Sequence, residues 1–505
     1  MSNLSELIPA GGGQNNTDFV ADGAITSGKP VILTAAGKAA QVAETARGNT
    51  IGAEQALAPF SPSGVAGGQT WAYDATNDQY LWAYGNPDAY QRGYASIVDV
   101  SSGTVVEGTR AVFYSPDAVR DLSATCIGSN KFLIIYLDDL SAYMYGIVAS
   151  VSGTSITYGS QVTINAGSTM ASPTGIAYSA TTDASLLVYM PTGAGNEIKL
   201  LRITVSGTTI TLGTAVNVST IFSVSYLSQN GQASIVNNAS SDEFFLFWRG
   251  QNSGANRPGY GGIVTMSSGG TLAGTTATKA TDLLRGFAGL AYCGNDTYVV
   301  VFLGETNRYL RYCVATVSGG NVTWGTDTVY ESSLQDTTQV SVAYDSSVDK
   351  VVVTQRPDGS PYNRTYSTGD LSGTTITFAS LTALSPATGI TSFPVLIYDP
   401  SLQNTLFIYE NSSTDVVLRL WEVTGDIPNL TATNLLGIAS AAILDTATGT
   451  INTWGSRNEV QTSLTIGSDY YVQSDGTITT ASASPAQLIG EAITATQINI
   501  KDYTG

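Results

Sequence analysis

Histidine is absent from this chain of 505 residues. Its absence removes the commonest general base and the commonest protein ligand for transition metals. Cysteine is scarce as well, because Cys126, Cys293 and Cys313 form an odd, sparse set instead of a disulfide framework. We expect buried free thiols, with a bridge between Cys293 and Cys313 as the alternative, and we expect neither a cofactor nor a bound metal ion.

Charge is also in short supply. Charged residues make up only 12% of the chain, and acidic residues outnumber basic ones to give a net charge of −18. A surface of that sign repels nucleic acid and anionic membranes. The sequence contains no apolar run long enough to cross a bilayer, and its first residues lack the basic and apolar stretches of a secretion signal. We therefore expect no nucleic-acid partner and no membrane insertion.

The sequence is rich in glycine, with 53 residues, and it contains a short stretch that recurs. The stretch reads VSGTSITYG at 151–159, VSGTTITLG at 205–213, VSGGNVTWG at 317–325 and LSGTTITFA at 371–379. Such a period of roughly fifty residues indicates a repeat architecture. Glycine supplies the permissive turn dihedral, and serine and threonine bond to the local backbone.

Each repeat contains four apolar or alternating stretches separated by turn residues. In one unit these are SVAYD (341–345), the strongly apolar KVVVTQ (350–355), an alternating stretch, and the threonine-rich stretch after the Ser-Gly turn. A strand that is apolar on both faces must be covered on both sides. Four-stranded units that cover one another are the blades of a β-propeller. The expected fold is therefore all-β: a seven-bladed β-propeller inserted in a small split β module.

The seventh unit ends near Gly425 without its threonine-rich strand, whereas TIGAEQALA (50–58) resembles TITLGTAVNV (209–218). We expect Thr50–Ala58 to pair beside Leu418–Val423 and to close the ring, with an ordinary linker as the alternative.

The two ends of the chain share a second repeat. ITSGKPVILTAAGKA (25–39) aligns without gaps to LTIGSDYYVQSDGTI (464–478), and LLGIASAAI (435–443) resembles LIGEAITA (488–495). Unrelated β-hairpins are the alternative to a split module. The expected organisation is a flexible arm at 1–18, the N-terminal half of a small β module at 19–48, the propeller at 49–430 and a C-terminal β module at 431–505.

The order of these two repeats resembles that of repeat-rich tail-fibre and virion proteins of marine bacteriophages and cyanophages. The resemblance rests on 146–164, 340–355 and 463–496. It implies a virion structural protein, assembled in the host cytoplasm, in an appendage that attaches to the host surface. It also implies other virion proteins as partners through the terminal β modules, a host glycan or protein as receptor, and a homo-oligomer, most simply a trimer. A capsid decoration or head-fibre protein, a propeller-type glycan hydrolase and a bacterial surface adhesin are the alternatives.

Signals for catalysis are weak. SGGNVTWGTD (318–327) shares Thr323-Trp324 with the turn of sialidase-like propellers but lacks its aspartate. Arg308, Arg311 and Glu305 surround one loop, which is also what ordinary solvated strand ends look like. Acidic residues such as Asp345 and Asp349 are read as solvated turn residues, because their spacing fits no calcium loop. We do not expect an enzyme.

Tyrosine is the more interesting signal, with 27 residues against 13 phenylalanines. Tyrosine combines an apolar face with a polar tip and suits binding surfaces. Packing between neighbouring units is the alternative use for each of these rings. The receptor contacts that we predict are Tyr90, Tyr143, Trp248, Tyr260, Tyr309 and Tyr362.

Overall fold

The computed structural model describes most of the chain and divides it into two units. Unit 1 comprises Met1–Gly48 and Thr424–Gly505, and unit 2 comprises Asn49–Val423. The described residues are 15–57, 68–85, 92–101, 103–115, 118–165, 171–191, 197–222, 233–238, 240–250, 258–281, 284, 289–304, 308–332, 335–357, 364–384, 394–411, 415–482 and 487–501.

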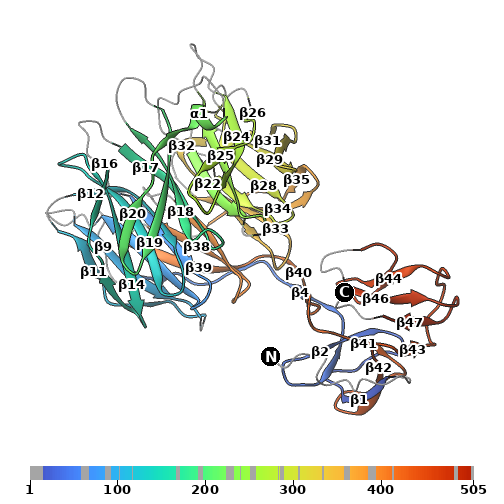
Figure 1. Cartoon of the computed structure of the whole chain (residues 1–505). Coiled ribbons are helices and arrows are strands. Elements are labelled where there is room, and N and C mark those ends of the chain that lie inside the picture. The colour runs from blue at the N-terminus through green and yellow to red at the C-terminus, as the bar shows by residue number, and fades with distance from the viewer. Residues whose placement is uncertain are drawn as a thin grey trace. The chain divides into compact units, whose positions relative to one another are not determined.

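Unit 2 contains seven antiparallel sheets in its described residues, and each sheet has three long strands (Figure 1). The first strands are β7 (Gln69–Asp74), β12 (Val119–Cys126), β17 (Ala171–Ser179), β22 (Ala233–Asn238), β27 (Gly289–Tyr292), β32 (Gln335–Asp345) and β37 (Val395–Asp399). The second strands are β8 (Gln79–Gly85), β13 (Lys131–Asp138), β18 (Ala184–Pro191), β23 (Glu243–Arg249), β28 (Thr297–Leu303), β33 (Lys350–Pro357) and β38 (Asn404–Glu410). The third strands are β9 (Gly93–Asp99), β14 (Met144–Ser152), β19 (Lys199–Ser206), β24 (Gly259–Met266), β29 (Leu310–Ser318), β34 (Thr365–Ser372) and β39 (Val416–Glu422).

The fourth position of each sheet is an outer edge in two short pieces, both paired with the third strand. The first pieces are β10 (Val106–Glu107), β15 (Ser155–Tyr158), β20 (Thr209–Leu212), β25 (Leu272–Gly274), β30 (Asn321–Trp324), β35 (Thr375–Phe378) and β5 (Thr50–Ile51). The second pieces are β11 (Ala111–Tyr114), β16 (Val162–Asn165), β21 (Val216–Asn217), β26 (Thr278–Thr281), β31 (Thr328–Glu331), β36 (Thr382–Ala383) and β6 (Gln55–Ala56). The expected all-β class with four-stranded sheets is confirmed.

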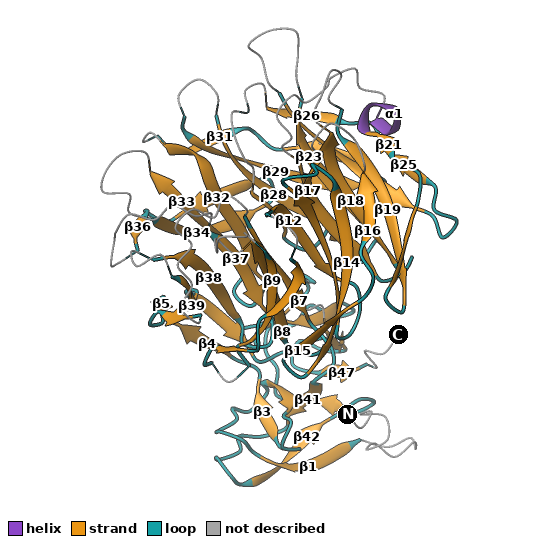
Figure 2. Cartoon of the chain, turned by 90° about the vertical axis from the view of Figure 1, so that its left-hand side faces the viewer, coloured by secondary structure: helices purple, strands orange, loops and turns teal. Residues whose placement is uncertain are grey.

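Strands make up nearly all of the regular structure, and the described residues contain one short helix, α1 (Val218–Phe222) (Figure 2). No helix in the described ranges is long and apolar enough to cross a membrane.

In unit 2 the apolar second strands are buried between neighbouring sheets. On β13, Phe132 and Ile134 pack in a cluster with the first sheet, while Leu133 and Ile135 pack in a cluster with the third. Side chains of a strand point alternately to opposite faces, so one strand supplies both clusters. Since a sheet on its own would leave both of these faces in water, each sheet depends on its two neighbours.

We call the contact between two neighbouring sheets a seam. The recurring nine-residue sequence also contributes to these seams, because its last residue packs against the next copy. A Cβ on Gly159 would lie 2.7 Å from Cβ of Thr208, the turn residue of the next sheet. Gly325 and Thr374 form the same pair between the fifth and sixth sheets. Such a Cβ position is sterically excluded, so glycine is required where the neighbouring threonine approaches. Between the fourth and fifth sheets the pair is reversed, with Thr275 against Gly320.

Polar contacts between neighbouring sheets add to these seams. The turn between the first and second strands contains at least one residue with positive φ in every sheet, among them Asp78, Asn130 and Asp296. The Asn130 amide donates to Asp74 of the preceding sheet at 2.7 Å, and Asn238 Nδ2 donates to Asp296 of the following sheet at 2.5 Å. The turn therefore ties each of these sheets to its neighbour.

The predicted pairing of Thr50–Ala58 beside Leu418–Val423 is confirmed. Ile51 pairs with Trp421 on β39, and Ala56 pairs with Val417. The seventh sheet also contacts the first, because Tyr80 donates to the Asp399 carboxylate at 2.8 Å and the two sheets share one apolar cluster. The seam between the last and the first sheet is thus built like the others.

Unit 1 contains two copies of one five-stranded module. The first module consists of β1 (Asn16–Val20), β2 (Pro30–Leu33), β3 (Ala39–Gln41), β41 (Leu435–Ala439) and β42 (Thr448–Asn452). The second module consists of β43 (Arg457–Asn458), β44 (Asp469–Val472), β45 (Ile478–Thr479), β46 (Gln487–Ala492) and β47 (Ile498–Ile500). Numbered along the chain, both sheets have the strand order first, fifth, fourth, second, third.

Local details support the equivalence of the two modules. A Cβ on Gly437 would meet the Asn452 carbonyl oxygen at 2.1 Å, and a Cβ on Gly490 would meet that of Asn499 at 2.1 Å. The glycines that the alignment matched, Gly28 with Gly467 and Gly37 with Gly476, all have positive φ. Unit 2 is therefore an insertion between the third and fourth strands of the first module.

Two expected boundaries differ from the structure. Residues 16–18 were assigned to the flexible arm, yet they begin β1, because Asn16 pairs with Asn452 and Asp18 with Thr450. Residues 424–430 were assigned to the propeller, yet they belong to unit 1. The reason is a two-stranded ribbon of β4 (Glu44–Arg47) and β40 (Gly425–Pro428), which joins the two passages of the chain.

The two modules share a core. Ile32, Leu435 and Ile438 of the first module pack with Val472, Ile489 and Ile498 of the second in one apolar cluster. Side-chain amides cross the same boundary: buried Asn458 Nδ2 donates to Asn452 Oδ1 at 2.7 Å, and half-buried Gln461 Nε2 donates to the Gly28 carbonyl at 2.9 Å. The face that the first module buries on the second is therefore apolar.

Candidate functional site

The ends of the sheets in unit 2 differ in what they connect. The chain enters at Asn49 and leaves at Val423, where the other sheets turn from the third strand to the outer edge. The connections between second and third strands lie at the opposite end of each sheet, which we call the loop end. In an all-β scaffold of this kind, loops at one end of rigid strands supply binding residues.

The predicted receptor contacts come out unequally. Tyr90 and Tyr362 lie outside the described residues. Tyr143, in the β13–β14 connection at the loop end, is 37% exposed, and Tyr309, before β29, is half-buried. Neither observation tests whether these side chains bind a receptor.

The prediction for Trp248 is wrong. Its side chain is only 1% exposed and belongs to the apolar cluster between the third and fourth sheets. The ring of Phe222 in α1 stacks on the Trp248 ring with the centroids 4.9 Å apart, and the ring of Tyr260 stacks on it with the centroids 5.9 Å apart. Tyr260 itself is half-buried. Trp248 therefore follows the alternative that tyrosines and tryptophans pack between neighbouring units.

The β13–β14 connection is the loop-end connection that the structure describes in full. The Asp138 carboxylate is buried at its base and accepts hydrogen bonds from Tyr114 Oη at 2.8 Å and Ser141 Oγ at 2.5 Å. Arg120 pairs with Asp139 at 2.9 Å on the flank. Leu140 at the tip is 81% exposed. These bonds fix the loop in advance, so a partner would bind it without the cost of ordering it.

Sequence reasoning missed Leu140, because a single leucine in a polar loop carries no pattern. It also read the turn acids as solvated, and this is wrong for Asp138 and Asp345, which are both buried. Asp345 accepts bonds from the Ser347 amide at 3.1 Å and from the Ser347 hydroxyl. Both aspartates can be buried for the same reason. The backbone and hydroxyl groups of a tight turn supply the hydrogen bonds that a buried carboxylate needs.

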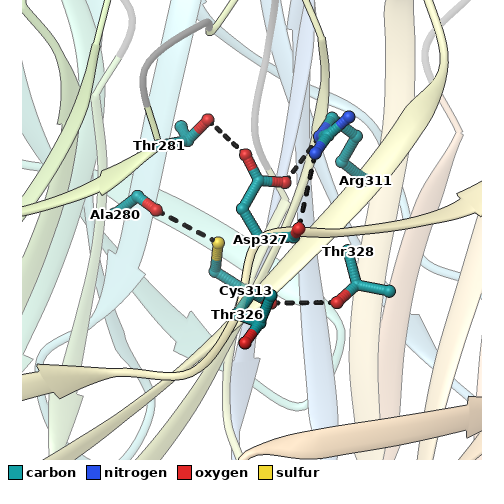
Figure 3. A network of polar contacts seen from close by, with 7 residues as sticks. All are labelled: Ala280, Thr281, Arg311, Cys313, Thr326, Asp327 and Thr328. Atoms are coloured by element: carbon teal, nitrogen blue, oxygen red, sulfur yellow. Dashed lines mark hydrogen bonds and ion pairs between the residues drawn. The ribbon is translucent and has the colours of Figure 1, made fainter.

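Figure 3 shows the surroundings of Arg311, which the sequence places with Arg308 and Glu305 around one loop. Arg311 Nε donates to Asp327 Oδ1 at 2.5 Å, and Thr281 of the fourth sheet donates to the other oxygen of this carboxylate at 2.5 Å. The arginine, a carboxylate and a hydroxyl thus satisfy one another across a seam between sheets. Glu305 lies outside the described residues.

Trp324, the residue shared with the sialidase-like turn, also lies in a seam. Its indole nitrogen donates to Thr278 Oγ1 at 2.8 Å, and its ring packs edge-on against Phe245 and Phe247 of the fourth sheet. A Cβ on Gly261 would lie 2.4 Å from this ring. The tryptophan therefore has a packing role that explains its presence without catalysis.

The cysteines are free, which excludes the bridge between Cys293 and Cys313. Burial raises the pKa of Cys126 to about 11 and that of Cys293 to about 12. Because the thiolate is the reactive form, both are poor nucleophiles near neutral pH. In the part of the chain that the structure describes, no group of three Cys, Asp or Glu side chains is placed to hold a metal ion.

Comparisons with protein-family models and with curated protein sequences give no match. Solved structures of propeller proteins are similar in fold. PpgL, a periplasmic gluconolactonase of Pseudomonas aeruginosa, is 11% identical with a TM-score of 0.44, and the match covers 64% of this chain and 86% of that chain. The β-propeller domain of the Trilobed protease from Pyrococcus furiosus is 10% identical with a TM-score of 0.40, covering 72% and 98%.

A third similar structure is AofleA from Arthrobotrys oligospora, at 11% identity and a TM-score of 0.38, covering 68% of this chain and 90% of that chain. At such low identities and TM-scores these likenesses transfer no activity, substrate or partner. The chain is all-β with sheets of the propeller type.

Proposed function

We propose that this chain is a non-enzymatic structural protein of a virus particle, in a tail fibre or another appendage. Unit 1 attaches it to the particle, and unit 2 is displayed toward the host surface. One observation carries the proposal: unit 2 is a continuous insertion whose two ends lie side by side. Trp421 Nε1 donates to Asn49 Oδ1 at 2.7 Å there, and the β4–β40 ribbon follows. A domain held by adjacent ends extends from its host module without disturbing it.

We further propose that Asn49–Val423 is a seven-bladed β-propeller, closed by β5 and β6. The seam between the seventh and first sheets supports this, because Ser401 Oγ donates to Asp78 at 2.5 Å in the same turn that ties other neighbours. The Val105 backbone amide also donates to Gln55 Oε1 at 2.8 Å. A ring leaves no wide sheet edge open for pairing with other proteins.

The absence of catalysis is part of the proposal. The chain has no histidine, and Arg311 already pairs with Asp327. The resemblance of the two repeats to virion proteins of marine bacteriophages supports a structural role. We propose other virion proteins as partners of unit 1, a homo-oligomer, most simply a trimer, and a host glycan or protein at the loop end of unit 2.

A gold-labelled antibody against this chain, applied to purified particles and viewed by electron microscopy, tests the proposal. We expect label on an appendage. Label spread over the capsid would favour the decoration or head-fibre alternative. Particles without any label would overturn the virion assignment, and hydrolysis of host polysaccharide by the purified chain would overturn the non-enzymatic one.

A further inference from the structure

The seventh sheet of unit 2 has the shortest outer edge. Its two pieces, β5 and β6, have two residues each, whereas each of the other six outer edges contains a piece of four residues. From Thr50 to Ala56 no side chain is buried, and Leu57 is the first that is. Few backbone pairs and little apolar burial are typical of a segment that opens locally. We call 50–56 the closing edge.

The pairing of the closing edge continues the pairing of the β4–β40 ribbon. At the end of the ribbon, Arg47 pairs with Gly425. Three residues further along the first passage of the chain, Thr50 pairs with Glu422, which lies three residues earlier on the second passage. The register is therefore unchanged from the ribbon of unit 1 to the closing edge of unit 2.

Side chains add hydrogen bonds on both sides of this transition. Thr424 Oγ1 donates to the Arg47 carbonyl at 3.3 Å, and Trp421 Nε1 donates to Asn49 Oδ1 at 2.7 Å. Trp421 is fully buried, and its ring packs edge-on against that of Tyr366 in the sixth sheet, with the centroids 4.6 Å apart. The start of the closing edge is thus connected to the interior of unit 2 as well as to the ribbon.

The core of unit 1 anchors the ribbon at its other end. Val42 and Leu430, which flank the ribbon, are buried in the apolar cluster that the two modules share. Further along the two passages, β2 pairs with β41 and β1 pairs with β42. An isolated two-stranded ribbon is only marginally stable in water, so the ribbon depends on the folded first module.

We propose that 44–57 and 416–428 form one latch, by which the folded first module of unit 1 keeps the seventh sheet of unit 2 closed. With Arg47 held beside Gly425, the closing edge stays near β39 at a high effective concentration. Ordering it then costs less conformational entropy than ordering a free segment would. Such coupling is reciprocal, so a partner that stabilises the first module also tightens the closing edge. The latch does not depend on the virion assignment.

Hydrogen exchange of the full chain, read by mass spectrometry in a peptide covering 49–57, tests the latch. The first variant carries a Gly-Ser-Gly-Ser insertion between Gly48 and Asn49, which leaves every strand intact but interrupts the shared register. We expect exchange in 49–57 to become about 10-fold faster, because the flexible insertion lowers the effective concentration of the closing edge.

The control carries the same insertion between Gly153 and Thr154, in the turn between β14 and β15 of the second sheet. That turn has no link to unit 1, so exchange in 49–57 should match the wild type. Circular dichroism of both insertion variants checks that the fold is preserved.

A second variant acts from inside unit 1. Gly437→Ala places a Cβ 2.1 Å from a backbone carbonyl oxygen in the first module, and Gly490→Ala creates the equivalent contact in the second. We expect Gly437→Ala to speed exchange in 30–33, which reports opening of the first module, and also in 49–57. Gly490→Ala should change exchange in 49–57 less, because the second module contains neither passage of the latch.

Three outcomes would overturn the latch. Wild-type exchange in 49–57 of the first variant would show that the closing edge is stable without the ribbon. Equal acceleration in the control would assign the effect to any lengthening of unit 2. Faster exchange in 30–33 of Gly437→Ala, with no change in 49–57, would show that the first module and the closing edge open independently.

Discussion

Both units of this protein are built from repeats, but their apolar clusters lie in different places relative to those repeats. In unit 2 the apolar clusters lie between sheets, as in the cluster shared by the first and second sheets. In unit 1 the first module closes a core of its own around Val31, Leu436 and Ile451. A sheet of unit 2 shares its apolar clusters with the sheets on both sides, whereas the first module of unit 1 has one cluster of its own and shares a second cluster with the other module. The comparison predicts that substitutions at seams damage unit 2 and that substitutions inside a module damage unit 1.

The largest effect is expected inside the modules. Gly437→Ala and Gly490→Ala each place a Cβ about 2.1 Å from a backbone carbonyl oxygen, and backbone cannot yield as a side chain does. We expect a loss of about 3 kcal/mol in the free energy of unfolding, at the upper end of overpacking costs. Hydrogen exchange in unit 1, measured on the full chain, reports it. Gly37→Ala is the comparison variant: no atom lies within 4 Å of its Cβ, so its loss reports only the cost of an alanine at positive φ, about 1–2 kcal/mol. A loss in Gly37→Ala as large as in the other two variants would remove the explanation by steric contact.

A seam in unit 2 offers a reversible test. Gly159→Thr should clash with Thr208 and destabilise unit 2 by about 2 kcal/mol. Adding Thr208→Gly should recover part of that loss, because it removes the clash with the threonine side chain but leaves the backbone carbonyl oxygen of residue 208, which a Cβ on residue 159 would also meet at 2.7 Å. Urea unfolding of the two single variants and the double variant completes the cycle. Additive losses would show that the two residues do not interact.

Alkaline pH should destabilise unit 2 more than unit 1. Burial raises the pKa of Cys126 to about 11 and that of Tyr178 to about 12, and both residues lie in unit 2. The folded state then holds these protons more tightly than the unfolded state, so their contribution is complete below pH 9 and is lost as pH rises toward 12. We expect unit 2 to lose about 1 kcal/mol of stability or more between pH 9 and pH 11. Urea midpoints at the two pH values measure it, and unchanged midpoints would contradict it.

The smallest effect is expected from removing unit 2 altogether. Replacing Asn49–Val423 by a short glycine-serine turn makes the first module as continuous as the second. Arg47 and Gly425 already pair at the end of the ribbon. The folded unit 2 holds its own two ends together, where Trp421 Nε1 donates to Asn49 Oδ1 at 2.7 Å, so a short turn replaces a closure that the folded unit already provides. Unit 1 should therefore unfold cooperatively with nearly unchanged stability in circular dichroism. A molten product would show that the module needs unit 2 to fold.

The repeats made much of the fold predictable from the sequence. The Ser-Gly text marked the turn and outer edge of each sheet, and the missing strand after Gly425 led to the pairing of Ile51 with Trp421. The seam between Gly159 and Thr208 was not predictable, because each residue is explained locally as a turn former. Its cause lies in a contact between consecutive copies, which one copy does not contain.

The candidate contacts were less predictable for a related reason. Trp248 lies near the end of β23 and Tyr143 in the connection after β13, and both segments are second strands of similar pattern, yet Trp248 is buried against Phe222 and Tyr143 is 37% exposed. Burial depends on which neighbouring sheet covers a strand end, and the local sequence does not state that. The same applies to Asn16–Asp18, whose polar residues gave no strand signal because their pairing partner Thr450–Asn452 lies at the other end of the chain.

The β4–β40 ribbon determines how unit 2 responds to cleavage by a protease. Two covalent passages, rather than one, tether unit 2. A protease that nicks either passage, or cuts once within any connection of unit 2, leaves both fragments attached through the remaining passage and the paired strands. Separating unit 2 from unit 1 requires cleavage of both strands of the ribbon.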